Sequence, residues 1–126
     1  MSDPASAAPA TMTIVLPIPS RKVTPNGRAG WRAKAKLVRK YRSLAFWRML
    51  ELLGGEKPPR PVAYSYRYHW GSNRRDDDNA IASGKAYLDG ICEALKIDDR
   101  ELRFRELIHE KDRTEPRMEV ILHLAP

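Results

Sequence analysis

Residues 62–70 constrain the fold more than any other part of this chain, because two kinds of side chain alternate along them. Small or polar residues occupy the odd positions, and large apolar residues occupy the even ones. The large residues are Val62, Tyr64, Tyr66, Tyr68 and Trp70. A period of two with aromatic and β-branched residues is typical of a β-strand. Such a face can stack on bases, but a sheet face covered by helices is the commoner arrangement, so we expect these side chains to lie in a core.

A long helix is predicted just before this strand, over residues 31–53. The segment contains neither proline nor glycine, and two glycines follow it as a natural helix end. Its apolar side chains recur at spacings of three and four residues, which places them on one helical face. They are Val38, Tyr41, Ala45, Met49 and Leu52. We expect this face to pack against the sheet.

Four shorter elements complete the predicted fold. Each is indicated by its own apolar pattern, with a period of two for a strand and 3.6 for a helix. They are a strand at 12–18, a helix from Asp78 or Asn79 to about Leu95, and strands near 102–108 and 118–124. The order β-α-β-α-β-β predicts an α/β or α+β fold, with one mixed sheet covered by two helices.

The 126 residues suffice for one domain and leave no room for two. Residues 1–12 are small and rich in proline and alanine, so we expect a disordered tail before a domain that spans 13–126. Turn-forming residues predict a loop at 20–30. The only cysteine, Cys92, cannot form an internal disulfide, which favours a reducing, cytoplasmic location. No stretch approaches the ~20 apolar residues that span a bilayer, so we expect a soluble protein.

Charge is distributed unevenly along the chain. Lysine and arginine number 23 against 16 aspartates and glutamates, a formal net charge of +7, and ten of the basic residues but a single acid lie in residues 1–50. The first predicted helix therefore carries basic residues with no acidic partner one turn away. Its basic stripe consists of Arg32, Lys36, Arg39 and Lys40. Most such stripes are only solvated, but one without counter-charges suits phosphates, and we expect it to contact nucleic acid.

Three consecutive acids lie in segment 73–79, between the aromatic strand and the second helix. In an extended chain alternate side chains share a side, so Asp76 and Asp78 are expected to converge while Asp77 points away. Two convergent carboxylates suit a hard cation such as Mg²⁺. Capping of the helix by Asp78 or Asn79 is the simpler explanation, but it accounts for one acid and not three.

Further polar residues flank this segment. Arg74 and Arg75 precede the acids and are suited to bind phosphate. Asp98 and Asp99 follow the second helix, and either is a candidate third metal ligand or simply part of a turn. A metal held by carboxylates beside arginines and a basic helix is suited to phosphodiester hydrolysis. The histidines lie on predicted strands and are interpreted as polar-face residues, not bases; they are His69, His109 and His123.

Lys85 has two possible roles. It lies seven residues after Asp78, close to two helical turns, so the two share a side of the helix and the lysine can lean toward the metal site. It can equally form an i,i+4 ion pair with Asp89. The spacing does not decide between them.

The sequence RRDDDN, followed by KAYLDGI and IDDRE, resembles the RusA family of crossover junction endodeoxyribonucleases, the Holliday junction resolvases. The opening IVLPIPS and, more loosely, TPNGRAGWRAKAK look like the start of phage-type members. The resemblance covers most of the chain after the tail. It implies a RusA-like fold and a homodimer that binds a four-way DNA junction and cuts symmetric strands with Mg²⁺, for which Mn²⁺ is a possible substitute. Neither a membrane nor a small-molecule substrate is expected.

The same resemblance implies which residues act. Three aspartates and a lysine carry catalysis in the family, and the aspartates match Asp76, Asp78 and Asp99, with Asp98 beside the last. The better-studied pattern has the lysine where this chain has Ala82, whereas the KAYLDGI segment matches it to Lys85.

The length of the second helix opposes a cluster of these aspartates. A straight helix from Asn79 to Leu95 would be about 25 Å long and would hold Asp76 and Asp99 apart, unless it begins late or bends near Gly84 or Gly90. The alternative function is a non-catalytic, basic nucleic-acid-binding module in which the acids form only a cap and a turn.

Overall fold

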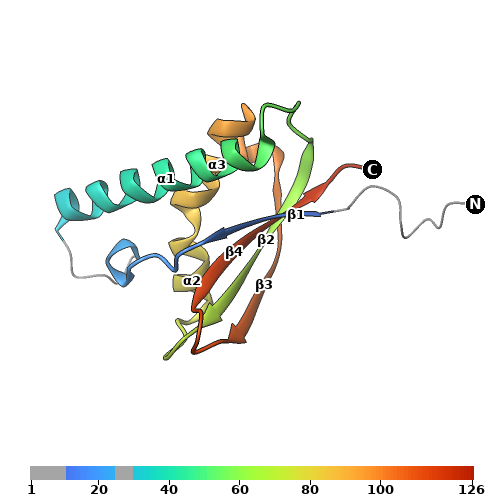
Figure 1. The fold of residues 1–126 in the computed structure, drawn as a ribbon. Helices are drawn as coiled ribbons and strands as arrows, with labels where there is room; N and C mark the ends of the chain where they lie inside the picture. Colours follow the sequence, from blue (N-terminus) through green and yellow to red (C-terminus); the bar gives the residue numbers. More distant parts are fainter. Residues whose placement is uncertain (1–10, 25–29) are drawn as a thin grey trace, which may run out of the picture.

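Four strands form one mixed sheet, and the helices lie on one of its faces (Figure 1). The computed structural model describes residues 11–24 and 30–126. The strands are β1 (Thr11–Leu16), β2 (Pro61–Trp70), β3 (Arg103–Lys111) and β4 (Arg117–Leu124). Their order is β1-β4-β2-β3, with β4 antiparallel to both neighbours and β2 parallel to β3. This confirms the predicted single α+β domain with a mixed sheet; its likeness to RusA stays a prediction.

The long helix α1 (Trp31–Leu53) has the predicted bounds, but its buried face differs in part. The buried residues Tyr41, Ala45, Met49 and Leu53 follow at intervals of four. Val38 is 36% exposed because the first turns of α1 extend beyond the sheet (Figure 1), and Leu52 is 48% exposed because Leu53 takes its place on the inner face. The prediction for these two residues was therefore wrong.

The predicted second helix is two helices, α2 (Asp77–Ser83) and α3 (Lys85–Leu95), which meet at Gly84. A Cβ at Gly84 would lie 2.5 Å from the Tyr66 ring, so only glycine allows the helices to pass so close to β2. The predicted helix is therefore interrupted at Gly84, one of the two glycines near which a bend is expected to be possible. The N-cap of α2 is Asp76, and not Asp78 or Asn79 as expected, because the helix already begins at Asp77.

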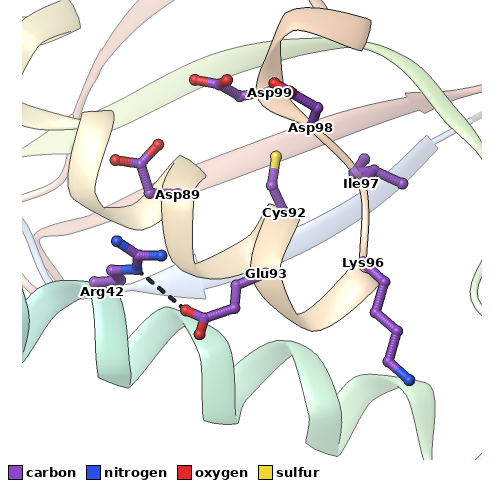
Figure 2. Close-up of a pocket in the computed structure, with 8 residues that line it drawn as sticks. All are labelled: Arg42, Asp89, Cys92, Glu93, Lys96, Ile97, Asp98 and Asp99. Atoms are coloured by element: carbon purple, nitrogen blue, oxygen red, sulfur yellow. Dashed lines mark hydrogen bonds and ion pairs between the residues drawn. The ribbon is translucent and has the colours of Figure 1, made fainter.

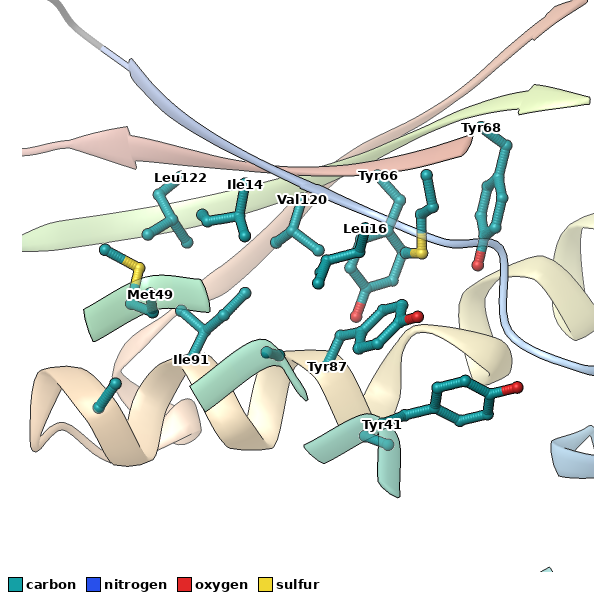
Figure 3. Close-up of a cluster of buried hydrophobic side chains, with 14 of the residues drawn as sticks. Ile14, Leu16, Tyr41, Met49, Tyr66, Tyr68, Tyr87, Ile91, Val120 and Leu122 are labelled. Atoms are coloured by element: carbon teal, nitrogen blue, oxygen red, sulfur yellow. The ribbon is translucent and has the colours of Figure 1, made fainter. Parts of the chain in front are cut away.

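The core lies between the sheet and the pair α1 and α3 (Figure 3). Tyr66, Tyr68 and Trp70 of β2 are buried there, which confirms the core interpretation of the aromatic face, whereas Val62 near the strand's start is exposed. Buried tyrosine hydroxyls need hydrogen-bond partners. Tyr68 donates to the Ala80 carbonyl at 2.5 Å, and Tyr87 of α3 donates to the Pro17 carbonyl at 2.6 Å.

Several terminal and loop predictions fall at the edge of the described structure. Thr11 and Met12, assigned to the tail, belong to β1, which ends at Leu16 before Pro17. The rest of the tail and residues 25–29 of the predicted loop lie outside the described residues. Residues Arg21–Val23 form a short 3₁₀ turn, η2. Within the described ranges no helix is long and apolar enough to cross a membrane.

Candidate active site

Lys85, the first residue of α3, bridges two aspartates. Its ammonium contacts the Asp99 carboxylate directly and lies 3.1 Å from Oδ1 of Asp89, one turn along α3. Burial disfavours the charged form of this lysine, but the hydrogen bonds to Asp99 and Asp89 outweigh it and raise the pKa of Lys85. Lys85 therefore makes the i,i+4 pair and also reaches a residue beyond the helix.

The chain reversal after α3 makes this contact possible. Lys96 has a left-handed backbone (φ 59°), and its N–H and that of Ile97 close the end of the helix on the carbonyls of its last turn. The chain then turns back beside α3 into the 3₁₀ turn η3 (Asp99–Glu101) (Figure 2). Asp99 thereby comes into contact with Lys85 at the start of the helix.

A pocket of about 550 Å³ opens between α1, α3 and η3 (Figure 2). It is lined by Arg42, Asp89, Cys92, Glu93, Lys96, Ile97, Asp98 and Asp99. Burial and the carboxylates of Asp99 and Asp89 raise the pKa of Cys92 to about 12, so this thiol stays protonated and is a poor nucleophile. The chemistry of the pocket therefore lies in its carboxylates and in the neighbouring ammonium of Lys85.

Asp98 and Asp99 are adjacent in sequence but have different partners. Asp98 caps η3, accepting a hydrogen bond from the Arg100 N–H at 2.9 Å, and it pairs with the Arg100 guanidinium at 2.9 Å. These hydrogen bonds hold the pKa of Asp98 well below its usual range. Asp99 alone of the pair contacts Lys85.

The acids at the start of α2 also have different surroundings. Asp76 accepts hydrogen bonds from Asn79 N–H at 2.9 Å and from its side-chain amide at 3.1 Å. Asp78 is exposed in the first turn of α2, where its negative charge interacts favourably with the positive end of the helix dipole. Asp77 pairs with His109 on β3 at 2.9 Å. The prediction of alternating directions assumed an extended chain, which does not apply because Asp77 is already helical.

The predicted three-aspartate metal site is not assembled in the described part of the chain. Within residues 11–24 and 30–126, no three His, Cys, Asp or Glu side chains converge to hold a metal ion. Carboxylate oxygens are suitable donors for Mg²⁺, but the ammonium of Lys85 is bound between Asp89 and Asp99. As they are placed, the predicted ligands do not fit one shared ion.

The predicted phosphate-binding arginines divide into an exposed and a buried one. Arg74 is exposed, 3.8 Å from Asp77. Arg75 is only 7% exposed: its guanidinium donates to Ser83 Oγ at 2.9 Å and to the Pro19 carbonyl, and lies over the Trp70 ring. Burial lowers the pKa of Arg75. This arginine therefore joins the segment after β1 to α2. The basic stripe on α1, by contrast, is exposed at Arg32, Lys36, Arg39 and Lys40.

A small cavity nevertheless gives Arg75 a second arginine as neighbour. The cavity, of about 210 Å³, is lined by Arg21 and Arg75 and has no acidic lining residue. The Nε of Arg75 has no hydrogen-bond partner among the described residues, and the charge of Arg21 further lowers the Arg75 pKa. Two guanidinium groups beside a cavity without acidic lining residues are suited to bind an anion.

His109, which the sequence analysis interprets as a polar-face residue, lies between Trp70 and Asp77. Its Nδ1 accepts from the Trp70 indole at 2.8 Å. Because an indole only donates, Nε2 must carry the ring proton, and it faces Asp77. The other histidines lie among polar groups, His69 beside Glu119 and His123 beside Ser65. A bulge in β3 opposite Tyr64 and Tyr66 shifts the alternation and places His109 on the helix side; its local sequence carries no signal of this shift.

Comparison with models of protein families gives no match. Among curated proteins, one from Xylella fastidiosa (strain Temecula1 / ATCC 700964) is 33% identical to this chain over 105 residues. The alignment covers 80% of this chain and 69% of the relative, which is described only as an uncharacterized protein. The relationship therefore brings no activity with it.

Proposed function

This chain belongs to the same family as the uncharacterized Xylella fastidiosa protein, and we propose that it is a structure-selective DNA endonuclease. Its substrate is a branched DNA, the four-way Holliday junction, which it resolves by phosphodiester hydrolysis in DNA recombination and repair. Asp76, Asp78, Asp99 and Lys85 are the proposed catalytic residues, as the resemblance to the RusA family implies. The activity belongs in the cytoplasm, in keeping with the lone cysteine.

The contact between Lys85 and Asp99 carries this proposal. The two residues are 14 positions apart in the sequence, and the resemblance to the RusA family assigns both to catalysis. A lysine beside a carboxylate can stabilise the negative charge that develops on a phosphoryl oxygen, while the carboxylate orients a water molecule. Asp89, the second partner of Lys85, holds the ammonium in place.

Basic groups on two elements support DNA as the substrate. The exposed stripe on α1 and Arg74 are free to contact phosphates, and the cavity between Arg21 and Arg75 is suited to accept one. A junction has two symmetric strands to cut, so a homodimer with one site per subunit matches its symmetry.

Mg²⁺, or Mn²⁺ as its substitute, remains the proposed cofactor, with Asp76, Asp78 and Asp99 as its proposed ligands. This part of the proposal rests on the oxygen donors and on the family resemblance, since these aspartates do not converge in the described structure.

A cleavage assay on a labelled four-way junction with Mg²⁺ tests the proposal, with a linear duplex of the same sequence as reference. We expect the junction alone to be cut, and Asp78→Asn or Asp99→Asn to lose at least about 100-fold in rate. Asp77→Asn is the matched control, because Asp77 shares the exposed start of α2 but pairs with His109. It should retain cleavage. No cutting by the parent protein, or equal cutting by Asp78→Asn, would falsify the assignment.

The absence of an assembled metal cluster in the described residues favours one alternative, a non-catalytic nucleic-acid-binding module. This alternative predicts salt-sensitive DNA binding with no metal requirement. Titration calorimetry with Mg²⁺ or Mn²⁺ separates the two functions. If the protein binds the metal and Asp76→Asn abolishes the heat of binding, the nuclease is supported. If the parent protein shows no heat of metal binding, the binding module is supported.

A further inference from the structure

Helix α1 carries an exposed tryptophan on the same face as its basic residues. Lys36, Lys40 and Trp47 are spaced by four and seven residues, which places them in line on one helical face. Trp47 is 60% exposed, and both lysines are exposed. We call Lys36, Lys40 and Trp47 the outer ridge of α1.

Phe46 holds Trp47 in place and also lies near the candidate active site. Its ring meets that of Phe46 edge to face, with 5.2 Å between the ring centroids. Phe46 also lines a cavity of about 230 Å³ together with Arg39, Arg42, Ser43 and Glu93. Arg42 and Glu93, which form an ion pair at 3.1 Å, line this cavity and the acidic pocket alike. The two cavities therefore adjoin at Arg42 and Glu93, and Phe46, which contacts Trp47, lines the one nearer the ridge.

The charge around Trp47 selects its partner. No acidic residue lies in residues 31–50, so the ridge attracts a polyanion. Insertion into a membrane would require an apolar helix face, but the apolar face of α1 is already buried against α3 and the sheet. A flat aromatic ring on the same helical face as ammonium groups is suited to bind unpaired nucleic-acid bases, with the ring stacked on a base and the cations on phosphates of the strand.

We propose that the outer ridge of α1 binds the unpaired bases of a DNA strand, with Trp47 stacked on a base. Lys40 and Lys36, which lie about 10 Å and 16 Å from Trp47 along the helix, bind phosphates farther along the same strand. This inference rests on the proposed function, because it takes DNA as the partner. It adds that the protein engages bases opened out of the duplex and not the phosphate backbone alone. Trp47 is a binding residue here and takes no part in the hydrolysis.

Binding of labelled single strands, measured by fluorescence anisotropy without metal, tests the inference. One strand carries all its bases, and a second of equal length carries abasic sites, which keep the phosphates and remove the stacking partners. We expect Trp47→Ala to weaken binding of the first strand about 5- to 100-fold and to leave binding of the abasic strand unchanged. Trp47→Phe should restore most of the loss. Lys40→Ala should weaken binding of both strands equally.

Leu52→Ala is the control, since Leu52 is an exposed apolar residue of the same helix without basic neighbours on the ridge; it should change neither affinity. Equal weakening of both strands by Trp47→Ala, or binding of Trp47 to anionic phosphatidylserine vesicles and not to DNA, overturns the inference. Failure of the nuclease proposal would show separately, as base-dependent binding without junction cleavage.

Discussion

Lys85 is expected to matter far more for cleavage than for stability. Its side chain is 57% exposed, and ion pairs of exposed groups contribute about 0–1 kcal/mol. Lys85→Gln should therefore lower the free energy of unfolding by less than about 1 kcal/mol, while junction cleavage falls at least about 100-fold. Urea unfolding and the cleavage assay, run on the same preparation, compare the two effects. A variant that unfolds but cuts normally when folded would refute the catalytic role.

The stabilisation by Lys85 has a definite pH dependence. Its hydrogen bonds to Asp99 and Asp89, which outweigh its burial, raise the pKa of Lys85 above the ordinary value of 10.5. A group whose pKa is raised by folding stabilises the fold below the unfolded pKa and loses that effect as pH rises through the folded one. The stability difference between the parent and Lys85→Gln should be present at neutral pH and shrink above pH 10.5. Denaturant unfolding across this range measures it.

Lys96 offers a stabilising substitution. Its left-handed backbone costs an L-residue about 1 kcal/mol, which glycine does not pay. Lys96→Gly should raise the free energy of unfolding by up to about 1 kcal/mol, as measured by urea denaturation. Lys96→Ala, which removes the same side chain and keeps the Cβ, should show no such gain, and an equal gain there would contradict the backbone explanation.

At the scale of elements, the packing of α1 on α3 depends on a close approach at Gly90. A Cβ at this position would lie 2.1 Å from the Arg42 carbonyl oxygen, so the two helices would have to separate. We expect Gly90→Ala to destabilise the fold by about 3 kcal/mol, at the upper end of overpacking costs. Gly30→Ala is the control, because no atom of the described residues lies within 4 Å of a Cβ there. Thermal unfolding of both variants tests this, and a near-neutral Gly90→Ala would show that the helices adapt.

The elements also show how far local patterns predict this fold. The alternation in β2 correctly indicated the burial of Tyr66, Tyr68 and Trp70, because side-chain period is a local property of a strand. The break at Gly84 and the shift in β3 arise from contact with β2. Apolar periodicity alone reads 79–95 as one helix and His109 as an outward residue, since it carries no information about which strand lies alongside.

For the whole molecule, the concentration of basic residues in the first part of the chain governs the salt dependence of DNA binding. Affinity falls as salt rises, and each neutralised phosphate contact makes the negative slope of log affinity against log salt steeper by about 0.9. A Lys36→Ala, Lys40→Ala double variant removes two such contacts, so the magnitude of the slope should fall by about 2. Lys57→Ala, an exposed lysine in the loop after α1, is the control and should leave it unchanged. Equal slopes in all three proteins would exclude the ridge from phosphate contact.

The sequence by itself determined the element types, the mixed α+β architecture, the charge asymmetry and the acids that flank the second helical region. These follow from periodicity, turn residues and composition, which act over a few residues. Only the tertiary structure decided that Asp99, and not Asp98, meets Lys85, and that Arg75 is buried while its neighbour Arg74 is exposed. Each of these outcomes depends on contacts between segments far apart in the chain. The sequence alone cannot show which of two adjacent residues of the same type is buried or paired, because that depends on which distant segment lies beside them.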